Sequence, residues 1–296
     1  MNRSSLGRRL CAIAACAAIA CSAELLAQPT AYPTAEAAAA ALVEAVKSDD
    51  KSALGKVLGN DWKDYIPVGD IDRDDVDAFL AKYAEKHSIS SEGGTSHLVV
   101  GQGWVLPMPM VKGASGWTFD LVQARKEILV RHIGNNELST LRAMLAYYDA
   151  QRDYAAADRN GDGVLEYAQK FISTASKHDG LFWETEGDEP LSPLGPAFDG
   201  KTPGEAYHGY AYRILTAQGP SAPGGAYDYV IGGRMRSGFA VVAWPVRYAE
   251  TGVMTFMVSH DGIVFQKDLG KDTAKNVESI KRFDPDSSWQ EITEDD

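Results

Sequence analysis

The chain has 296 residues, of which 45% are apolar, and a formal charge of −12 at pH 7. This apolar content is typical of a folded globular protein and excludes a largely disordered one. The acidic excess argues against nucleic acid or an anionic membrane surface as a partner, because both are bound through basic patches. Cations, neutral envelope polymers and envelope proteins are the partner classes left, and no segment after the N-terminus predicts a transmembrane helix.

The N-terminus has the three parts of a secretory signal peptide. Three arginines precede an apolar stretch over residues 10–20, which is too short to span a bilayer. Ala27 then supplies a small residue before the cleavage point, so residues 1–27 are expected to be removed and Gln28 to begin the mature chain. The segment holds three Arg and one Glu, so its removal changes the formal charge to −14. The sequence therefore predicts an exported protein, periplasmic or secreted.

The three cysteines, Cys11, Cys16 and Cys21, all lie in this N-terminal segment. The mature chain is therefore expected to contain no disulfide, although an oxidising compartment would permit one. The run AIAC at residues 18–21 loosely resembles the lipid-attachment motif of bacterial lipoproteins, but leucine is missing three residues before the cysteine. A lipid anchor at Cys21 is thus the less favoured alternative to a free N-terminus at Gln28.

The first part of the mature chain predicts helices followed by a hairpin. Helical spacing of apolar residues, after capping Thr or Asp residues, predicts three helices. These helices are expected over residues 36–47, 51–58 and about 75–86. The spacing then changes to that of strands, which are expected over residues 97–110 and 116–120.

The middle of the chain predicts a helix–loop–helix. Asn135 or Asn136 is expected to cap a helix that runs to about residue 157. A short acidic loop follows, and a second helix is expected over about residues 165–176. Gly, Pro and acidic residues over 177–206 then predict a long ordered loop or linker.

The C-terminal part predicts an antiparallel sheet with a closing helix over residues 273–282. Asp261-Gly262 is a tight-turn signal between two of the strands. The strands are expected over residues 210–217, 239–248, 253–259 and 263–267. The whole sequence therefore predicts an α+β fold with a signal peptide and three regions. The regions are an N-terminal α+β unit at 28–132, a helix–loop–helix with a long loop at 133–206, and a C-terminal antiparallel β unit at 207–296.

The sharpest chemical motif is DRNGDGVLE at residues 158–166, which fits the start of an EF-hand calcium loop. Oxygen ligands alternate along such a loop because its tight turn directs every second side chain inward. The candidate ligands are Asp158, Asn160, Asp162, the carbonyl of Val164, and Glu166.

The end of this loop departs from the calcium-binding pattern. Gly163 supplies the sharp turn, but Gln169 stands at the twelfth position, where a bidentate glutamate is expected. The loss of one charge and one oxygen predicts a weak calcium site. The alternative is a plain acidic turn in which Asp and Asn side chains accept backbone hydrogen bonds. Both interpretations remain open.

Aromatic residues and a histidine beside the long loop form a second candidate site. Trp183, Tyr207 and His208 could line a ligand-binding cleft, or they could pack the loop onto the sheet. The sequence contains no nucleophile elbow, metalloprotease motif, phosphate-binding loop or dinucleotide fingerprint, so no catalytic residue is assigned. A hydrolase is still compatible with the sequence, because a pair of catalytic carboxylates leaves no motif.

A series of short segments, in this order along the chain, resembles an exported bacterial family catalogued as domain of unknown function 2950. The resemblance covers the chain from about residue 34 to residue 289. It implies export and a shared fold, and it implies no activity. The segments include GNNEL at 134–138, DAQRDY at 149–154, DGLFW at 179–183, SPLG at 192–195, YHGY at 207–210, LTAQG at 215–219, GFA at 238–240, GVMTF at 252–256, KDLG at 267–270 and FDPD at 283–286.

The C-terminal third is also similar to the β-sheet head of pseudopilin-like proteins, in GFAVVAWP at 238–245 and TGVMTF at 251–256. This similarity implies an antiparallel sheet, while the uncleaved apolar helix of a pilin is missing. The favoured interpretation is an exported, non-enzymatic protein that binds a partner or takes part in envelope assembly. The alternative is an uncharacterised periplasmic hydrolase or ligand-binding enzyme, with His208 facing a carboxylate in a deep cleft.

Overall fold

The computed structural model describes residues 29–66, 72–185, 191–195 and 206–293. Its antiparallel sheets and helices confirm the predicted α+β fold. The chain forms two compact units, the first ending at Ala124 and the second beginning at Arg125. The predicted signal peptide, with Cys21 and the expected cleavage point, lies outside the described residues.

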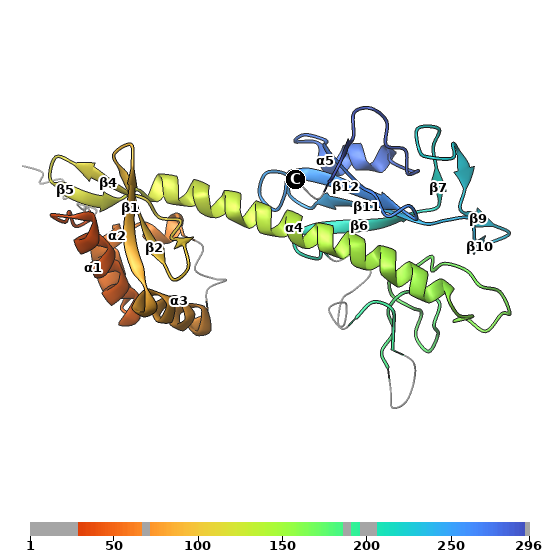
Figure 1. Ribbon diagram of the computed structural model, residues 1–296, viewed down its shortest axis with the longest axis horizontal. Helices are drawn as coiled ribbons and strands as arrows, with labels where there is room; N and C mark the ends of the chain where they lie inside the picture. The colour runs from red at the N-terminus through yellow and green to blue at the C-terminus, as the bar shows by residue number, and fades with distance from the viewer. Residues whose placement is uncertain (1–28, 67–71, 186–190, 196–205, 294–296) are drawn as a thin grey trace, which may run out of the picture. The chain divides into compact units, whose positions relative to one another are not determined.

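The first unit places three helices beside a five-stranded antiparallel sheet (Figure 1). The helices are α1 (Ala35–Lys47), α2 (Lys51–Leu58) and α3 (Arg73–Glu85), with the short 3₁₀ helix η1 (Trp62–Asp64). The strands are β1 (His87–Glu92), β2 (Thr95–Val100), β3 (Trp104–Val105), β4 (Met110–Gly113) and β5 (Gly116–Phe119), and the sheet order is β1-β2-β4-β5 with β3 paired to β2.

Capping side chains begin these helices at the predicted places. Thr34 accepts a hydrogen bond from the Ala37 amide at 3.1 Å, and Asp50 accepts one from the Ser52 amide at 2.8 Å. Asp72 forms a capping box with Asp75, so two amides at the start of α3 are paired. The strand β1 was not predicted, because its sequence HSISSE is almost entirely polar and exposed.

The second unit is built around α4, a helix of 35 residues from Leu121 to Ala155. The prediction that this helix starts at Asn135 or Asn136 was wrong. The side chain of Asp120 accepts a hydrogen bond from the Gln123 amide at 2.9 Å and caps the helix more than three turns earlier. The two asparagines lie inside the helix.

A five-stranded antiparallel sheet in the order β14-β13-β12-β11-β6 forms the body of the second unit. The strands are β6 (Tyr210–Leu215), β7 (Ala217–Gln218), β8 (Tyr227–Asp228), β9 (Val230–Ile231), β10 (Arg234–Met235), β11 (Ala240–Pro245), β12 (Met254–Ser259), β13 (Val264–Asp268) and β14 (Gln290–Glu291). The predicted closing helix is shorter than expected and consists of α5 (Thr273–Asn276) and the 3₁₀ helix η3 (Val277–Ser279).

Both faces of this sheet are covered. In β6 the ring of Tyr212 meets Phe171 on one face, while Arg213 donates to the carbonyls of Val277 and Ile280 on the other, at 2.6 and 2.7 Å. Figure 1 shows the sheet between α4 and α5. Two-sided burial explains why the inner strand β11, between β12 and β6, is a continuous apolar run rather than an alternating one.

Side chains of α4 hold the sheet by hydrogen bonds to its backbone. Glu137 accepts from the amides of Val253 and Met254, at 2.8 and 2.9 Å, where β12 begins. Tyr147 is buried, with 3% of the residue exposed, and its hydroxyl donates to the carbonyl of Ala240 in β11. These bonds fix α4 along the strands, since buried backbone groups need partners.

The predicted second helix over residues 165–176 is wrong, because this segment is irregular and extended. Its backbone groups pair with distant parts of the chain instead of with each other. The Ala168 amide donates to Gln151 in α4, the Tyr167 amide donates to the Met235 carbonyl, and the Lys170 carbonyl accepts from the Leu181 amide. Tertiary hydrogen bonds therefore replace the helix.

We expect Gln151→Leu to lower the free energy of unfolding by about 2–4 kcal/mol, because it leaves the amide and the carbonyl of Ala168 buried without partners. Urea denaturation of the purified protein measures this loss. Gln169→Leu is the matched control, because Gln169 is exposed and makes one bond, to the Gly233 carbonyl. Its expected loss is under about 1 kcal/mol. Equal losses for the two variants would contradict the role given to Gln151.

Candidate functional site

The predicted calcium-like loop begins directly after the last turn of α4 and is folded by Asp158. One oxygen of this carboxylate accepts from the amides of Gly161 and Asp162, at 2.8 and 3.2 Å. The other accepts from the Gly163 amide at 2.8 Å. Gly163 has a φ of 83°, a left-handed conformation that favours glycine. The motif therefore folds as a tight turn around a single carboxylate.

Three further side chains of the loop gather at one point. The amide nitrogen of Asn160 donates to Glu166 at 2.5 Å and lies 3.5 Å from the carboxylate of Asp162. Burial raises the pKa of Glu166, and the neighbouring charge of Asp162 raises it further. The second oxygen of the Glu166 carboxylate is buried and has no hydrogen-bond partner in the described residues. Two carboxylates thus converge on one donor.

The loop has the start of an EF-hand but not its end. Val164 donates its amide to Asp162 at 3.0 Å, and Gln169, at the twelfth position, donates to the Gly233 carbonyl. Within the described ranges, no three His, Cys, Asp or Glu side chains form a ready metal cluster. A cation held here would therefore need the side-chain oxygen of Asn160, which requires rotation of its amide, and the carbonyl of Val164.

A cationic side chain from the β9–β10 hairpin already neutralises part of the loop. The guanidinium of Arg234 lies 2.9 Å from the carboxylate of Asp162, and both side chains are about one third exposed. Tyr167, just after the loop, bridges to Met235 beside this arginine. A metal ion at the loop would therefore compete with Arg234 for Asp162.

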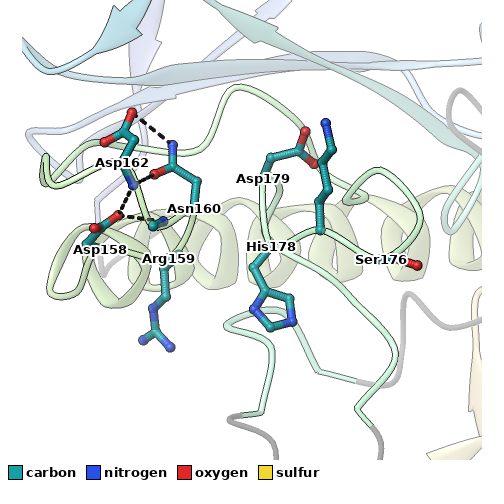
Figure 2. Close-up of a pocket in the computed structure, with 9 residues that line it drawn as sticks. Asp158, Arg159, Asn160, Asp162, Ser176, His178 and Asp179 are labelled. Carbon is teal, nitrogen blue, oxygen red and sulfur yellow. Dashed lines mark hydrogen bonds between the residues drawn. The ribbon is translucent and has the colours of Figure 1, made fainter.

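The loop forms one wall of an open polar pocket of about 630 Å³, and residues 176–179 form the opposite wall. Figure 2 shows Asp158, Asn160 and Asp162 on one side and Asp179 on the other. Since residues 158 and 176 are far apart in sequence, the two walls meet only because the segment between them turns back beside α4. This volume lies within the range of small-molecule sites.

Asp179 organises the second wall. It accepts from Lys170 at 2.7 Å and from the amide and hydroxyl of Thr174, at 2.7 and 3.0 Å. Partial burial opposes ionisation of this carboxyl, but the hydrogen bonds from Lys170 and Thr174 outweigh it and lower its pKa to about 2. Asp179 is therefore ionised and fully engaged at neutral pH.

His178 is fixed between a ring and a hydroxyl. Its imidazole stacks on Trp183 with 4.4 Å between ring centroids, and its carbonyl accepts from the hydroxyl of Tyr154 at 2.8 Å. Burial, together with the neighbouring charges of Glu166 and Asp179, raises the pKa of Tyr154 to about 12. The Tyr154 hydroxyl thus stays protonated and supports the pocket from α4.

The three predicted aromatic and histidine residues have separate surroundings. Trp183 is 6% exposed and packs in the core beneath His178. Tyr207 pairs its backbone with Tyr210, and its ring contacts His208. His208 is exposed on a turn, and no carboxylate among the described residues lies within hydrogen-bonding distance of it. The structure therefore connects Trp183 to the pocket through His178.

The family model described as protein of unknown function, DUF2950, matches residues 29–292. The chain belongs to this family. The resemblance inferred from the short sequence segments is thereby confirmed. No curated protein and no solved structure matches the chain. Among the described residues, no helix has the length and apolarity needed to cross a membrane.

The second wall of the pocket, at residues 176–179, was not predicted from the sequence. Its only signal was HDG at 178–180, which is typical of a turn.

We expect the stability that Asp179 contributes to depend on pH in a defined direction. Because its pKa in the folded state is lowered, its contribution is full above the unfolded pKa of about 4 and is lost as the pH falls towards 2. Asp179→Asn should cost about 1 kcal/mol at pH 7 and almost nothing at pH 2. Chemical denaturation of both proteins across this pH range measures the difference. A constant gap between the two proteins at all pH values would contradict the assignment.

Proposed function

We propose that this protein is exported and works by binding, as a non-enzymatic envelope protein whose loop 158–166 takes a calcium ion. Three features support export: the N-terminal arginines, the short apolar stretch and the small residue at Ala27. The acidic mature chain favours cations and neutral or cationic partners over nucleic acid. A lipid anchor at Cys21 is the competing form of the N-terminus.

The observation that carries the calcium proposal is the convergence of Asp162 and Glu166 on the amide nitrogen of Asn160. A donor at 2.5 Å from one carboxylate and 3.5 Å from the other occupies the position that a cation would take. Rotation of that amide turns its oxygen inward and adds a third ligand. The backbone hydrogen bonds to Asp158 hold the turn in shape before the ion arrives, which lowers the cost of binding.

The proposed site is a weak one. Gln169 replaces the bidentate glutamate and is itself bonded to Gly233, and Arg234 competes for Asp162. Fewer charged ligands and an internal competitor both reduce affinity. The expected dissociation constant is about 10⁻⁴–10⁻³ M, the range of extracellular calcium modules.

The enzyme alternative loses its main support. It required a cleft in which His208 faces a carboxylate, whereas His208 is exposed beside Tyr207. The pocket does contain Ser176, His178 and Asp179, but a relay needs the histidine bonded to both of the others. Among the described residues no such bonds join them, and Asp179 is engaged by Lys170 and Thr174. Binding is therefore the better supported role.

We expect the protein recovered from cells to begin at Gln28. Intact-mass analysis of the recovered protein separates this form, which lacks every cysteine, from a lipidated chain that begins at Cys21. A mass that corresponds to the lipidated chain would place the protein on a membrane by an anchor. A mass that retains residues 1–27 would refute export by cleavage.

We expect calorimetry to show one calcium-binding event in the purified protein and a loss of at least roughly tenfold in affinity for Asp162→Ala. Asp228→Ala is the matched control, since Asp228 is an exposed aspartate in β8, and it should bind calcium like the unchanged protein. Arg234→Gln should bind calcium more tightly, because it removes the competing cation from Asp162.

This last variant separates a specific site from general attraction to an acidic protein. General attraction would strengthen only slightly when one arginine is lost and would respond equally to Asp162→Ala and Asp228→Ala. No heat of binding at millimolar calcium, or equal affinities in all four proteins, would refute the calcium proposal.

A further inference from the structure

In the pocket between the two loops, the acceptor groups are largely occupied by the protein, while several donor groups are not. It contains three carboxylates, and each already has donors from the protein. Asp158 accepts from three backbone amides, Asp162 faces Arg234, and Asp179 accepts from Lys170 and Thr174. Apart from a metal ion at the loop, which would displace some of these donors, a ligand would find little acceptor capacity left.

The groups in the pocket that keep unused capacity are donors. Lys177 and Ser176 are exposed, and their side chains have no hydrogen-bond partner among the described residues. The imidazole of His178 is held by stacking and has its ring nitrogens unengaged within the described part of the chain. Arg159 donates its Nη2 to Asp153, at 3.3 Å, and its Nη1 has no hydrogen-bond partner among the described residues, while its Nε is buried out of a ligand's reach.

Figure 2 shows the direction in which two of these donor side chains point. The side chains of Arg159, from the first wall, and His178, from the second, point the same way and away from the carboxylates of Asp162 and Asp179. The guanidinium of Arg159 is held by Asp153 with only 17% of its side chain exposed, so its orientation is constrained. Preorganised donors on both walls lower the entropic cost of holding a ligand.

We propose that this pocket binds a small organic anion, one that carries a carboxylate or a phosphate group, through Lys177, His178 and Arg159. An anionic ligand supplies the acceptors that these donors lack, and hydrogen bonds between charged partners are the strongest available here. The volume of about 630 Å³ exceeds what a bare inorganic ion needs and suits a ligand of sugar-acid or sugar-phosphate size.

This inference rests on the proposed binding role and does not require the calcium ion. Calcium would be held by the loop 158–166, whereas Lys177 and His178 lie on the opposite wall. The anion should therefore bind when calcium is removed by a chelator. Failure of calcium to bind would leave the anion site intact.

The experiment uses four probes with the same sugar ring and different charges: glucose, glucosamine, glucuronate and glucose 6-phosphate. Each is titrated into the purified protein with a chelator present, and backbone amide shifts are followed by NMR. We expect the carboxylate or the phosphate probe to shift the amides of residues 176–179 and to bind more tightly than the neutral and cationic probes. The comparison of the two acids identifies which anionic group is preferred.

Two lysine variants test the assignment. Lys177→Gln removes a donor of the pocket and should weaken binding of the acidic probe roughly fivefold. Lys271→Gln removes an exposed lysine outside the pocket and should leave the affinity unchanged. Both positions are exposed, so neither change is expected to prevent folding.

Tighter binding of an acidic probe, together with a loss of affinity in Lys177→Gln but not in Lys271→Gln, supports the site. Equal binding of glucose and the acids, tighter binding of glucosamine, or equal losses in both lysine variants overturns it. Binding of the acids only when calcium is present also overturns it, because that result would place the anion on the metal ion.

Discussion

The buried amide of Gln151 is the interaction on which the second unit depends most. Its oxygen accepts from the Ala168 amide and its nitrogen donates to the Ala168 carbonyl, both at 2.8 Å, and the nitrogen also donates to Tyr147. With 0% of the residue exposed, no water can replace these partners. The chain that leaves α4 is therefore returned to it as an extended segment. This constraint brings residues 176–179 opposite the loop that follows Asp158.

A second contact from α4 completes the pocket. Tyr154 lies one turn after Gln151 on the same face of the helix and donates to the carbonyl of His178. The last turns of one helix thus fix the loop that follows it directly and the return segment that forms the opposite wall. The geometry of the pocket depends on α4 and its buried polar groups, because neither wall contains a helix or strand of its own.

The sequence was a good guide where structure is local. The helices α1 and α2 and four strands of the C-terminal sheet, β6, β11, β12 and β13, follow from apolar spacing, caps and the turn at Asp261-Gly262, since neighbouring residues determine each of them. The short strand β14 was not predicted. The expected helix over residues 165–176 failed because Gln151 and Met235 provide partners for its backbone that lie far away in sequence. The acidic loop was found by its motif, whereas the donors at 176–179 became part of a site only through this long-range pairing.

The acidity of the whole chain does not contradict an anion pocket, because electrostatic effects act over a limited distance. At physiological ionic strength charges more than about 8 Å apart are largely screened, so a ligand in the pocket responds mainly to Lys177, Arg159 and His178. Nearby carboxylates are offset by donors of their own, as Asp179 is by Lys170. A calcium ion held at the loop 158–166 would reduce the negative potential beside the pocket, so the two ligands would strengthen each other's binding by the same factor.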